Sequence, residues 1–501
     1  MIQVRNIGHS FEREIGFILA MFFEDPQVMY GTEWGQKTEG QDDDLLIELS
    51  VSPNLDGVHA TGRLVAGLTE YEYNYTRPYQ ERSEKGERKT AKQAVSYTLL
   101  TLLEKHTGME QGWGILTGIR PTKLLHKFLT SGMSQVEAAH HLKDDYMVRP
   151  YKLALLQEIV NRQLAVVPDL YKIDREVSVY IGIPFCPTKC AYCTFPAYAI
   201  QAQQQNVNVF LEGLQYEIRA MGEWLRRRNL PITSIYFGGG TPTSVTAEEL
   251  DQLFVTLYES FPHMDQVREV TVEAGRPDTI TPEKLDVMKK WKVDRISINP
   301  QSFTDETLLA IGRHHSVAEV KEKFLLAKDM GLNNINMDLI IGLPNEGVEE
   351  MKHSLHEVGE LHPASLTVHT LSFKRASEMT QNKEKYKVAS RTEILKMMEL
   401  ASQWTQDHGY HPYYLYRQKN ILGNLENVGY AKNGYESIYN IMIMEEAQTI
   451  LGLGCGAVSK LMKPGSGVLT RFPNPKDPKT YNDTYKLLVD EKIKALDEIY
   501  G

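Results

Sequence analysis

The chain has 501 residues and a formal net charge of −10 at pH 7, with 42% hydrophobic and 24% charged residues. These values are those of an ordinary globular protein of about two to four domains. They offer no broad basic surface, so nucleic acid is not an expected partner. No apolar run reaches the roughly 18 residues that cross a bilayer, and the start of the chain lacks a secretory signal. Three of the four cysteines lie in one short loop, which argues for a reducing compartment, so we expect a cytoplasmic protein.

Residues 1–110 are predicted to form an α/β accessory domain. Its predicted elements are a helix at 11–23, strands at 45–51, 58–65 and 71–75, and a helix at 90–106. Asp56-Gly57 is a hairpin signal between the first two strands, and Gly108 is a typical residue to end the second helix.

A tyrosine stripe marks the third of these strands, where Tyr71, Tyr73 and Tyr75 alternate with polar residues. The stripe can stack on a planar ligand, but packing against the following helix is the simpler expectation.

Residues 111–173 are predicted to be a helical connector. Arg120 and Lys123 form a basic turn that can hold a carboxylate or can be a solvated loop. Ser134 with Glu137 is a capping box that begins a helix.

In residues 174–374, short apolar runs alternate with amphipathic helices, which is typical of βα units and a parallel sheet. The predicted strands are 177–185, 234–239, 269–275, 295–301, 335–342 and 365–371. The helices between them begin at the predicted caps Thr246, Thr281 and Thr304. Six such units suit a partial (β/α)6 barrel, in which functional groups are expected at the C-terminal ends of the strands.

Residues 375–501 are predicted to be mainly helical, with helices at 391–409 and 481–499. Between them lie a basic and aromatic segment at 413–420 and a glycine-rich segment at 451–457, which we predict to be a turn. Cys455 in this turn is expected to be a small buried thiol.

The cysteine loop at 180–195 contains Cys186, Cys190 and Cys193 in the pattern C-x3-C-x2-C. Three thiolates on one short loop can hold three irons of a [4Fe–4S] cluster and leave the fourth iron open for a chelating ligand. A structural zinc site is the alternative, but closed zinc sites take four protein ligands. Coincidental clustering would explain neither the spacing nor the apolar strand that leads into the loop.

At these residues the chain resembles the radical S-adenosylmethionine (SAM) superfamily, and within it the oxygen-independent coproporphyrinogen III oxidase family, with most similarity to the HemZ subgroup. The resemblance extends from about Glu176 to Gly456, and the stretch GILTGIRPTKLLHK before it also resembles that subgroup. It implies a partial radical SAM barrel, a [4Fe–4S] cluster on the three cysteines, and SAM as a second cofactor, bound as one molecule or as two.

The resemblance also implies roles for ten further residues. Matching contacts to a first SAM are Tyr180, Gly239, Gly240, Thr241, Glu273 and Val458. Matching contacts to a second SAM are Tyr192, Gln301, Arg313 and Asp338. Each has a simpler explanation by itself, since a glycine run can be a tight turn and a strand-end carboxylate can be solvated. His314, His315 and His369 are given no role.

The implied activity is the oxidative decarboxylation of coproporphyrinogen III propionates to vinyl groups by a 5′-deoxyadenosyl radical, with a tetrapyrrole substrate and an electron donor as partners. Two departures stand against it. Thr194 and Phe195 follow Cys193, where the family has a fourth cysteine, and residues 1–173 differ from the family's N-terminal arm.

Two alternatives therefore stay open. The first is a haem-binding chaperone like HemW, although Tyr439 replaces the histidine of that signature. The second is a radical SAM methyltransferase, which would also use two cofactor molecules.

Overall fold

The computed structural model describes residues 1–501 except 32–43, 118–119, 196, 201–203, 374–376 and 419–420. It divides into two compact units, Met1–Gln157 and Glu158–Gly501. The finer division predicted at 110, 173 and 374 stays a prediction, and the last of these boundaries lies outside the described residues, as does the end of the predicted segment 413–420.

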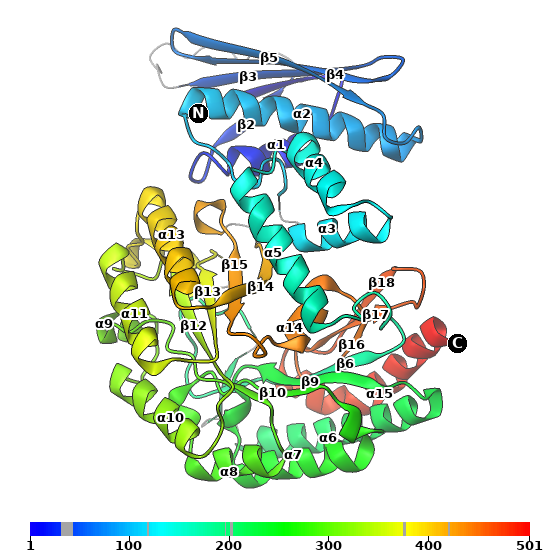
Figure 1. The fold of residues 1–501 in the computed structure, drawn as a ribbon, viewed down its shortest axis with the longest axis vertical. Coiled ribbons are helices and arrows are strands. Elements are labelled where there is room, and N and C mark those ends of the chain that lie inside the picture. The colour runs from blue at the N-terminus through cyan, green and yellow to red at the C-terminus, as the bar shows by residue number, and fades with distance from the viewer. Residues whose placement is uncertain (32–43, 118–119, 196, 201–203, 374–376, 419–420) are drawn as a thin grey trace. The chain divides into compact units, whose positions relative to one another are not determined.

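The first unit is a five-stranded sheet of order β2-β1-β3-β4-β5 with helices on one face (Figure 1). Its elements are β1 (Ile2–Ile7), α1 (Glu12–Leu19), β2 (Val28–Gly31), β3 (Leu45–Pro53), β4 (Gly57–Ala66), β5 (Thr69–Pro78), α2 (Glu84–Thr107), α3 (Pro121–Thr130), α4 (Gln135–Tyr146) and the start of α5 (Pro150–Val166). β1 is parallel to both of its neighbours, and β3, β4 and β5 form an antiparallel meander. The predicted helices and hairpin are confirmed, whereas β1 and β2 were not predicted.

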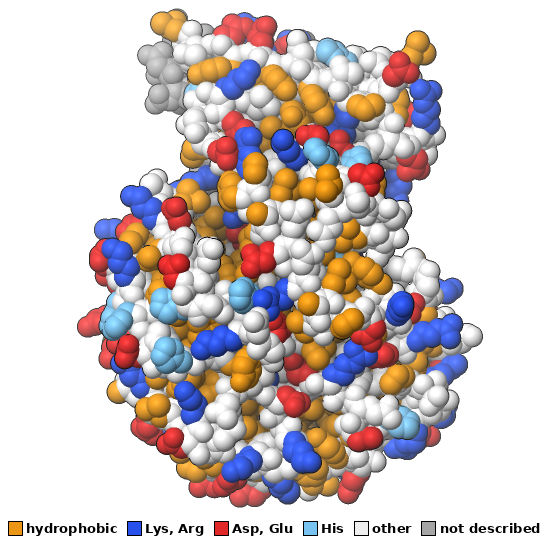
Figure 2. All heavy atoms as spheres, viewed as in Figure 1, with side chains coloured by type: hydrophobic (Ala, Val, Ile, Leu, Met, Phe, Trp, Pro, Cys, Tyr) orange, Lys and Arg blue, Asp and Glu red, His pale blue; other side chains and the backbone are white. Residues whose placement is uncertain are grey.

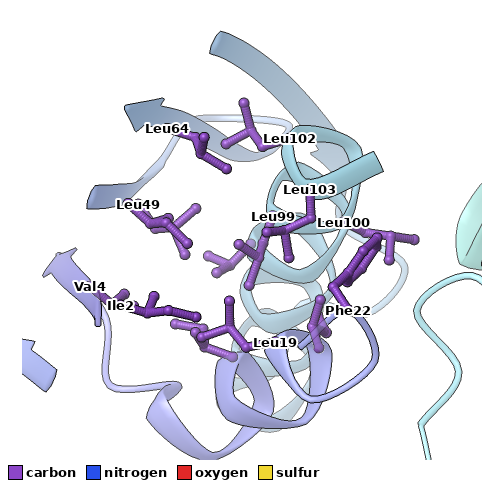
Figure 3. Packing of buried hydrophobic residues seen from close by; sticks show 14 of the residues in the cluster. Ile2, Val4, Leu19, Phe22, Leu49, Leu64, Leu99, Leu100, Leu102 and Leu103 are labelled. Atoms are coloured by element: carbon purple, nitrogen blue, oxygen red, sulfur yellow. The ribbon is translucent and has the colours of Figure 1, made fainter. Parts of the chain in front are cut away.

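The core of this unit lies between the sheet and helices α1 and α2 (Figure 3). Leu49 and Leu64 project from β3 and β4 toward Leu99 and Leu102 of α2, and all four are fully buried. The tyrosine stripe packs on the same helix, because Tyr75 stacks on Tyr97 with ring centroids 4.0 Å apart. The predicted packing role of the stripe is confirmed.

Local signals set the ends of these helices. Gly108 ends α2 with φ of 69°, a left-handed conformation that glycine adopts without strain. Ser134 and Glu137 form the predicted capping box of α4.

The second unit is built on an eleven-stranded sheet of order β14-β15-β13-β12-β11-β10-β9-β6-β16-β17-β18. Its strands are β6 (Val177–Ile183), β9 (Ile232–Gly239), β10 (Glu269–Val272), β11 (Arg295–Ser297), β12 (Ile335–Ile341), β13 (Ser365–Thr370), β14 (His411–Tyr416), β15 (Asn427–Ala431), β16 (Thr449–Gly454), β17 (Val458–Met462) and β18 (Leu469–Pro473). The short pair β7 (Phe185–Cys186) and β8 (Tyr198–Ala199) stands apart from this sheet.

All six predicted barrel strands are present, as β6 and β9 to β13, and neighbouring members are parallel. The helices of this unit are α6 (Gln204–Arg228), α7 (Ala247–Ser260), α8 (Pro282–Lys290), α9 (Asp305–Ala310), α10 (Val317–Asp329), α11 (Val348–Leu361), α12 (Glu378–Gln381), α13 (Arg391–Asp407), α14 (Ile438–Glu445) and α15 (Pro478–Tyr500), with 3₁₀ turns η2 (Pro242–Ser244) and η4 (Pro277–Thr279). Figure 1 shows α6, α7, α8, α10 and α11 outside the strands, so the predicted α/β barrel architecture is confirmed.

The predicted caps Thr246 and Thr281 accept hydrogen bonds from the first turns of α7 and α8. Thr304 precedes α9 but makes no side-chain capping bond.

The described part of the C-terminal region contains its predicted helices and also five strands that were not predicted. The glycine-rich segment at 451–457 is not only a turn, because its first part is in β16, which pairs in parallel with β6. Gly454 lies so close to β6 that a Cβ there would be 2.3 Å from the Gly182 carbonyl oxygen. Cys455 follows β16 and is buried, as predicted.

No helix in the described part of the chain is long and apolar enough to cross a membrane. On the face shown in Figure 2, Lys and Arg side chains are interspersed with Asp and Glu side chains.

Candidate cofactor site

The inner side of the barrel keeps a small number of accessible side chains. In β6, β12 and β13 every residue is buried except one, which is Tyr180, Asp338 and His369 respectively. In β9, Tyr236 is partly exposed beside Tyr180, its partner in register. Because helices cover the outer face of these strands, an accessible residue in mid-strand must face the interior. These four side chains therefore face the inside of the barrel, and we call them the inner group.

The cysteine loop follows β6. Cys186 is buried in β7, with its sulfur 3.3 Å from Thr241 Oγ1. Cys190 and Cys193 are partly exposed and share a tight turn, in which the Cys193 amide donates to the Cys190 carbonyl at 3.0 Å. None of the four cysteines forms a disulfide bond. Burial raises the pKa of Cys186 to about 11, so its thiolate form needs a bound cation to stabilise it.

The three cysteines of the loop suit an iron–sulfur cluster, in which each thiolate binds a separate iron. Among the described residues, no three His, Cys, Asp or Glu side chains gather closely enough to hold one ion. A cluster presents a separate iron to each thiolate, so its ligands stand further apart than those of zinc.

The glycine run, which consists of Gly238, Gly239 and Gly240, lies directly against this loop. A Cβ at Gly240 would be 2.7 Å from the Phe185 carbonyl oxygen and 3.1 Å from Cys186 Sγ. Gly239 has φ of 113°, which other residues rarely adopt. The Gly240 amide donates to the Ile183 carbonyl at 2.8 Å, so it is not the unpaired group that a glycine run can offer. The glycines provide close approach instead.

Glu273 follows β10 and faces the same space. A Cβ at Gly238 would lie 3.0 Å from Glu273 Oε2 and 3.0 Å from the Tyr180 ring. Burial, together with the nearby charge of Asp338, raises the pKa of Glu273 to about 7. The structure therefore brings together Tyr180, the glycine run and Glu273, as the sequence predicted for the first cofactor.

Gln301, Arg313 and Asp338 are also brought together. The Gln301 amide donates to the Asp338 carbonyl at 2.9 Å, and Gln301 has φ of 69°, a strained conformation for this residue. Arg313 Nη1 donates to the carbonyls of Gly275 and Asn299, both at 3.0 Å.

The positions that the resemblance implies for a second SAM thus lie beside the cysteine loop. Arg313 Nη2 donates to the Tyr192 hydroxyl at 3.4 Å, which joins the barrel interior to that loop. Burial alone would lower the pKa of Arg313, but Tyr192 and Cys190 raise it, so the guanidinium stays charged.

Three buried polar atoms near these residues lack a hydrogen-bond partner within the described part of the chain: Asn299 Oδ1, Gln301 Oε1 and Arg313 Nε. Buried polar atoms are nearly always paired, so unpaired ones in one place suggest a polar ligand. Amide oxygens and a guanidinium suit the amino, hydroxyl and carboxylate groups of SAM.

Val458 is the first residue of β17 and its side chain is exposed, whereas its backbone lies against Gly452, the partner of Tyr180 in register.

Several side chains in or beside the inner group had no predicted role. His369 lies 3.4 Å from Asp338 Oδ2 through Nε2, and its Nδ1 is 3.2 Å from the Tyr416 hydroxyl. Tyr236 stacks on Tyr439 with ring centroids 4.5 Å apart, and both lie beside Tyr180.

Arg276 also had no predicted role, although it contacts Cys190. Its only sequence signal is its place in the run Arg276-Pro277-Asp278 just after Glu273.

Comparison with known proteins identifies the family. Residues 180–358 match the model of the radical SAM superfamily. The chain is 58% identical, over 97% of its length and 96% of the other, to the oxygen-independent coproporphyrinogen-III oxidase-like protein HemZ of Bacillus subtilis. It is 31% identical to the haem chaperone HemW of Haemophilus influenzae, over 64% of this chain and 79% of that one.

Among solved structures, coproporphyrinogen III oxidase (HemN) from Escherichia coli superposes with a TM-score of 0.51, at 21% identity over 66% of this chain and 72% of that one. This likeness supports the barrel fold. The cofactors of the radical SAM superfamily are a [4Fe–4S] cluster and SAM, as predicted from the cysteine loop. The chain belongs to the family of oxygen-independent coproporphyrinogen-III oxidase-like HemZ proteins, within the radical SAM superfamily.

Proposed function

We propose that the protein catalyses the oxidative decarboxylation of propionate side chains on coproporphyrinogen III or a closely related tetrapyrrole. The observation that carries this proposal is the group of unpaired buried atoms on Asn299, Gln301 and Arg313, next to the cysteine loop. Gln301 and Arg313 are two of the positions proposed for a second SAM, and Asn299 lies beside them, since its carbonyl accepts from Arg313. A second cofactor suits a substrate with two propionates to convert.

Each residue has a definite part in this proposal. Cys186, Cys190 and Cys193 would hold the cluster, and Tyr180, Gly239, Gly240, Thr241 and Glu273 would orient the first SAM. Val458 keeps its proposed contact to that SAM only if its backbone makes it, since the side chain is exposed. Tyr192, Gln301, Arg313 and Asp338 would orient the second.

The cofactors, when bound and reduced by an electron donor, supply the 5′-deoxyadenosyl radical that removes one hydrogen atom from a propionate. The bond to the carboxylate then breaks, carbon dioxide leaves, and one electron passes to an acceptor, so that each propionate becomes a vinyl group. The tyrosines and the carboxyl group of the inner group would face the tetrapyrrole and help to exclude water from it.

The second candidate is haem delivery, which the similarity to HemW favours. Against it, Tyr439 is buried and stacked on Tyr236, so this position offers no free ligand for haem iron. Methyl transfer is the third and has no observation of its own in its favour.

The deciding experiment is anaerobic incubation of the reconstituted protein with coproporphyrinogen III, SAM, a reductant and an electron acceptor. We expect the divinyl product, its loss in Cys190→Ala, and a strong decrease in Arg313→Ala. Cys455→Ala is the matched control and should keep both iron and activity, because Cys455 is a buried thiol in a different turn.

A parallel haem titration separates the alternatives. Stoichiometric haem binding and transfer without a divinyl product would favour the chaperone. Formation of 5′-deoxyadenosine without either result would leave the radical chemistry and reject the proposed substrate.

A further inference from the structure

Arg276 is a buried guanidinium, 3% exposed, in the loop between β10 and α8. One side of it forks onto Asp278, with Nε 3.0 Å and Nη2 2.8 Å from the two carboxylate oxygens. Its Nη1 faces the cysteine loop, 3.1 Å from Thr188 Oγ1 and 3.8 Å from Cys190 Sγ. An ion pair thus lies against one of the three cysteines proposed to hold the cluster.

The loop that carries this pair is fixed on the barrel side. The hydroxyl of Thr279 donates to the Arg276 carbonyl at 2.7 Å and lies 2.6 Å from the hydroxyl of Thr243, next to the glycine run. The guanidinium is therefore held in place by its own loop as well as by Asp278.

The cysteine side is fixed as well. Thr188 donates its hydroxyl to the Gly312 carbonyl at 3.0 Å while it accepts from Arg276. The Ala191 amide donates to the Ile311 carbonyl at 3.0 Å. Arg276 and Cys190 are consequently held together from both directions.

Few ionised groups face this place. Burial, and then Arg313 and Arg276, lower the pKa of His315 to about 3, so it is neutral near pH 7. Although burial by itself would raise it, Arg276 holds the pKa of Asp278 below its usual value. Among the described residues, the charges near Cys190 thus include those of Arg276, Asp278 and Arg313.

We propose that Arg276 and Asp278 set the reduction potential of the iron–sulfur cluster by acting on the sulfur of Cys190. Reduction adds one negative charge to the cluster. A cation that donates a hydrogen bond to a ligand sulfur stabilises the reduced form, and an anion opposes it. Arg276 raises the potential, and Asp278 limits that increase while it orients the guanidinium. Both are positioning residues, and the proposal rests on the cluster ligands but not on the tetrapyrrole substrate.

Two variants of this one pair give opposite expectations. Arg276→Gln removes the cation and leaves the anion, so the potential should fall. Asp278→Asn removes the anion and leaves the cation, so the potential should rise. Both break the same ion pair, so mere loosening of the loop would not shift the potential in opposite directions.

The measurement is a redox titration of the full-length, anaerobically reconstituted protein, followed by electron paramagnetic resonance of the reduced cluster. Iron content is measured first, so that a failure of the cluster assignment is recognised separately. We expect each variant to change the ratio of reduced to oxidised cluster about tenfold at a fixed potential, which is about 59 mV for one electron. Arg276→Lys should keep most of the native potential, because it retains the cation.

Asp251→Asn is the matched control, since it breaks the exposed pair with Lys290, 2.7 Å apart, far along the chain from the cysteines. Shifts of the same sign in Arg276→Gln and Asp278→Asn, or no shift in either, would overturn the proposal. The ion pair would then have a structural role only. If Arg276→Gln assembles no cluster, a potential in Asp278→Asn that does not rise is sufficient to reject it.

Discussion

Glu273 is a carboxyl group whose surroundings disfavour its negative charge. It faces Gly238 and the Tyr180 ring inside the barrel, and burial raises its pKa to about 7 from an ordinary 4.5. Between these two values the folded protein keeps a proton that the unfolded chain has released. The stability of the protein without cofactors should therefore decrease as the pH rises through this window.

Glu273→Gln removes this dependence, because the amide stays neutral at every pH. We expect the variant to match the wild type near pH 5 and to be more stable by about 1–3 kcal/mol near pH 8. Urea unfolding of the cofactor-free proteins at both pH values measures the difference. Glu248→Gln, at an exposed position of α7, is the control, and an equal response in both variants would contradict the assignment.

Local sequence signals were sufficient to predict some residues of the site and not others. Cys186, Cys190, Cys193 and the glycine run were predicted because their spacing is a property of adjacent residues. The stacking of Tyr236 on Tyr439 joins strand β9 to a helix far along the chain, and nothing near either residue indicates it.

The C-terminal helix α15 is held to the barrel by a buried ion pair. Lys492 and Glu217 of α6 are each 0% exposed, and Lys492 also donates to the Gly452 carbonyl of β16 at 2.5 Å. The Glu217 carboxylate further accepts from the Tyr481 hydroxyl at 2.7 Å and from the Gly454 amide at 2.8 Å. A single network thus joins α6, α15 and β16.

Lys492→Met should therefore be strongly destabilising, because it leaves the Glu217 charge buried without its cation. We expect a loss of about 3–5 kcal/mol in the free energy of unfolding, measured by chemical denaturation. Lys290→Met, which breaks an exposed pair, should cost about 0–1 kcal/mol.

Adding Glu217→Gln to Lys492→Met should recover part of the loss, since the buried charge is then absent. A cost for Lys492→Met as small as that of Lys290→Met would show that the network is not needed.

The six barrel strands were predictable from the sequence, because parallel strands that are buried on both faces are continuous apolar runs. β16 was not, because glycines at 452 and 454 resemble a turn in sequence. Those glycines are required by neighbours: a Cβ at Gly452 would lie 2.8 Å from the backbone of Val458, and one at Gly454 would meet β6. The reason for the pattern exists only once the chain is folded.

For the whole molecule, every residue proposed for the cofactors lies in the unit Glu158–Gly501. The last part of α5 belongs to this unit, where Arg162 pairs with Glu436 and Gln163 donates to Glu445 at 2.9 Å. The first unit has a separate core between its own sheet and helices (Figure 3).

A shortened chain of residues 150–501, which keeps α5 whole, should therefore bind the same iron per chain as the full protein and form 5′-deoxyadenosine from SAM at a comparable rate. Iron analysis and chromatography of the reaction products, with the full chain alongside, are the measurements. Residues 1–149 alone should show a cooperative thermal transition by circular dichroism, because their apolar core is complete within the fragment. A folded 150–501 fragment that binds no iron would contradict the assignment of the whole cofactor site to the second unit. A fragment that cleaves SAM but forms no divinyl product would instead place the requirement for the first unit at the tetrapyrrole step.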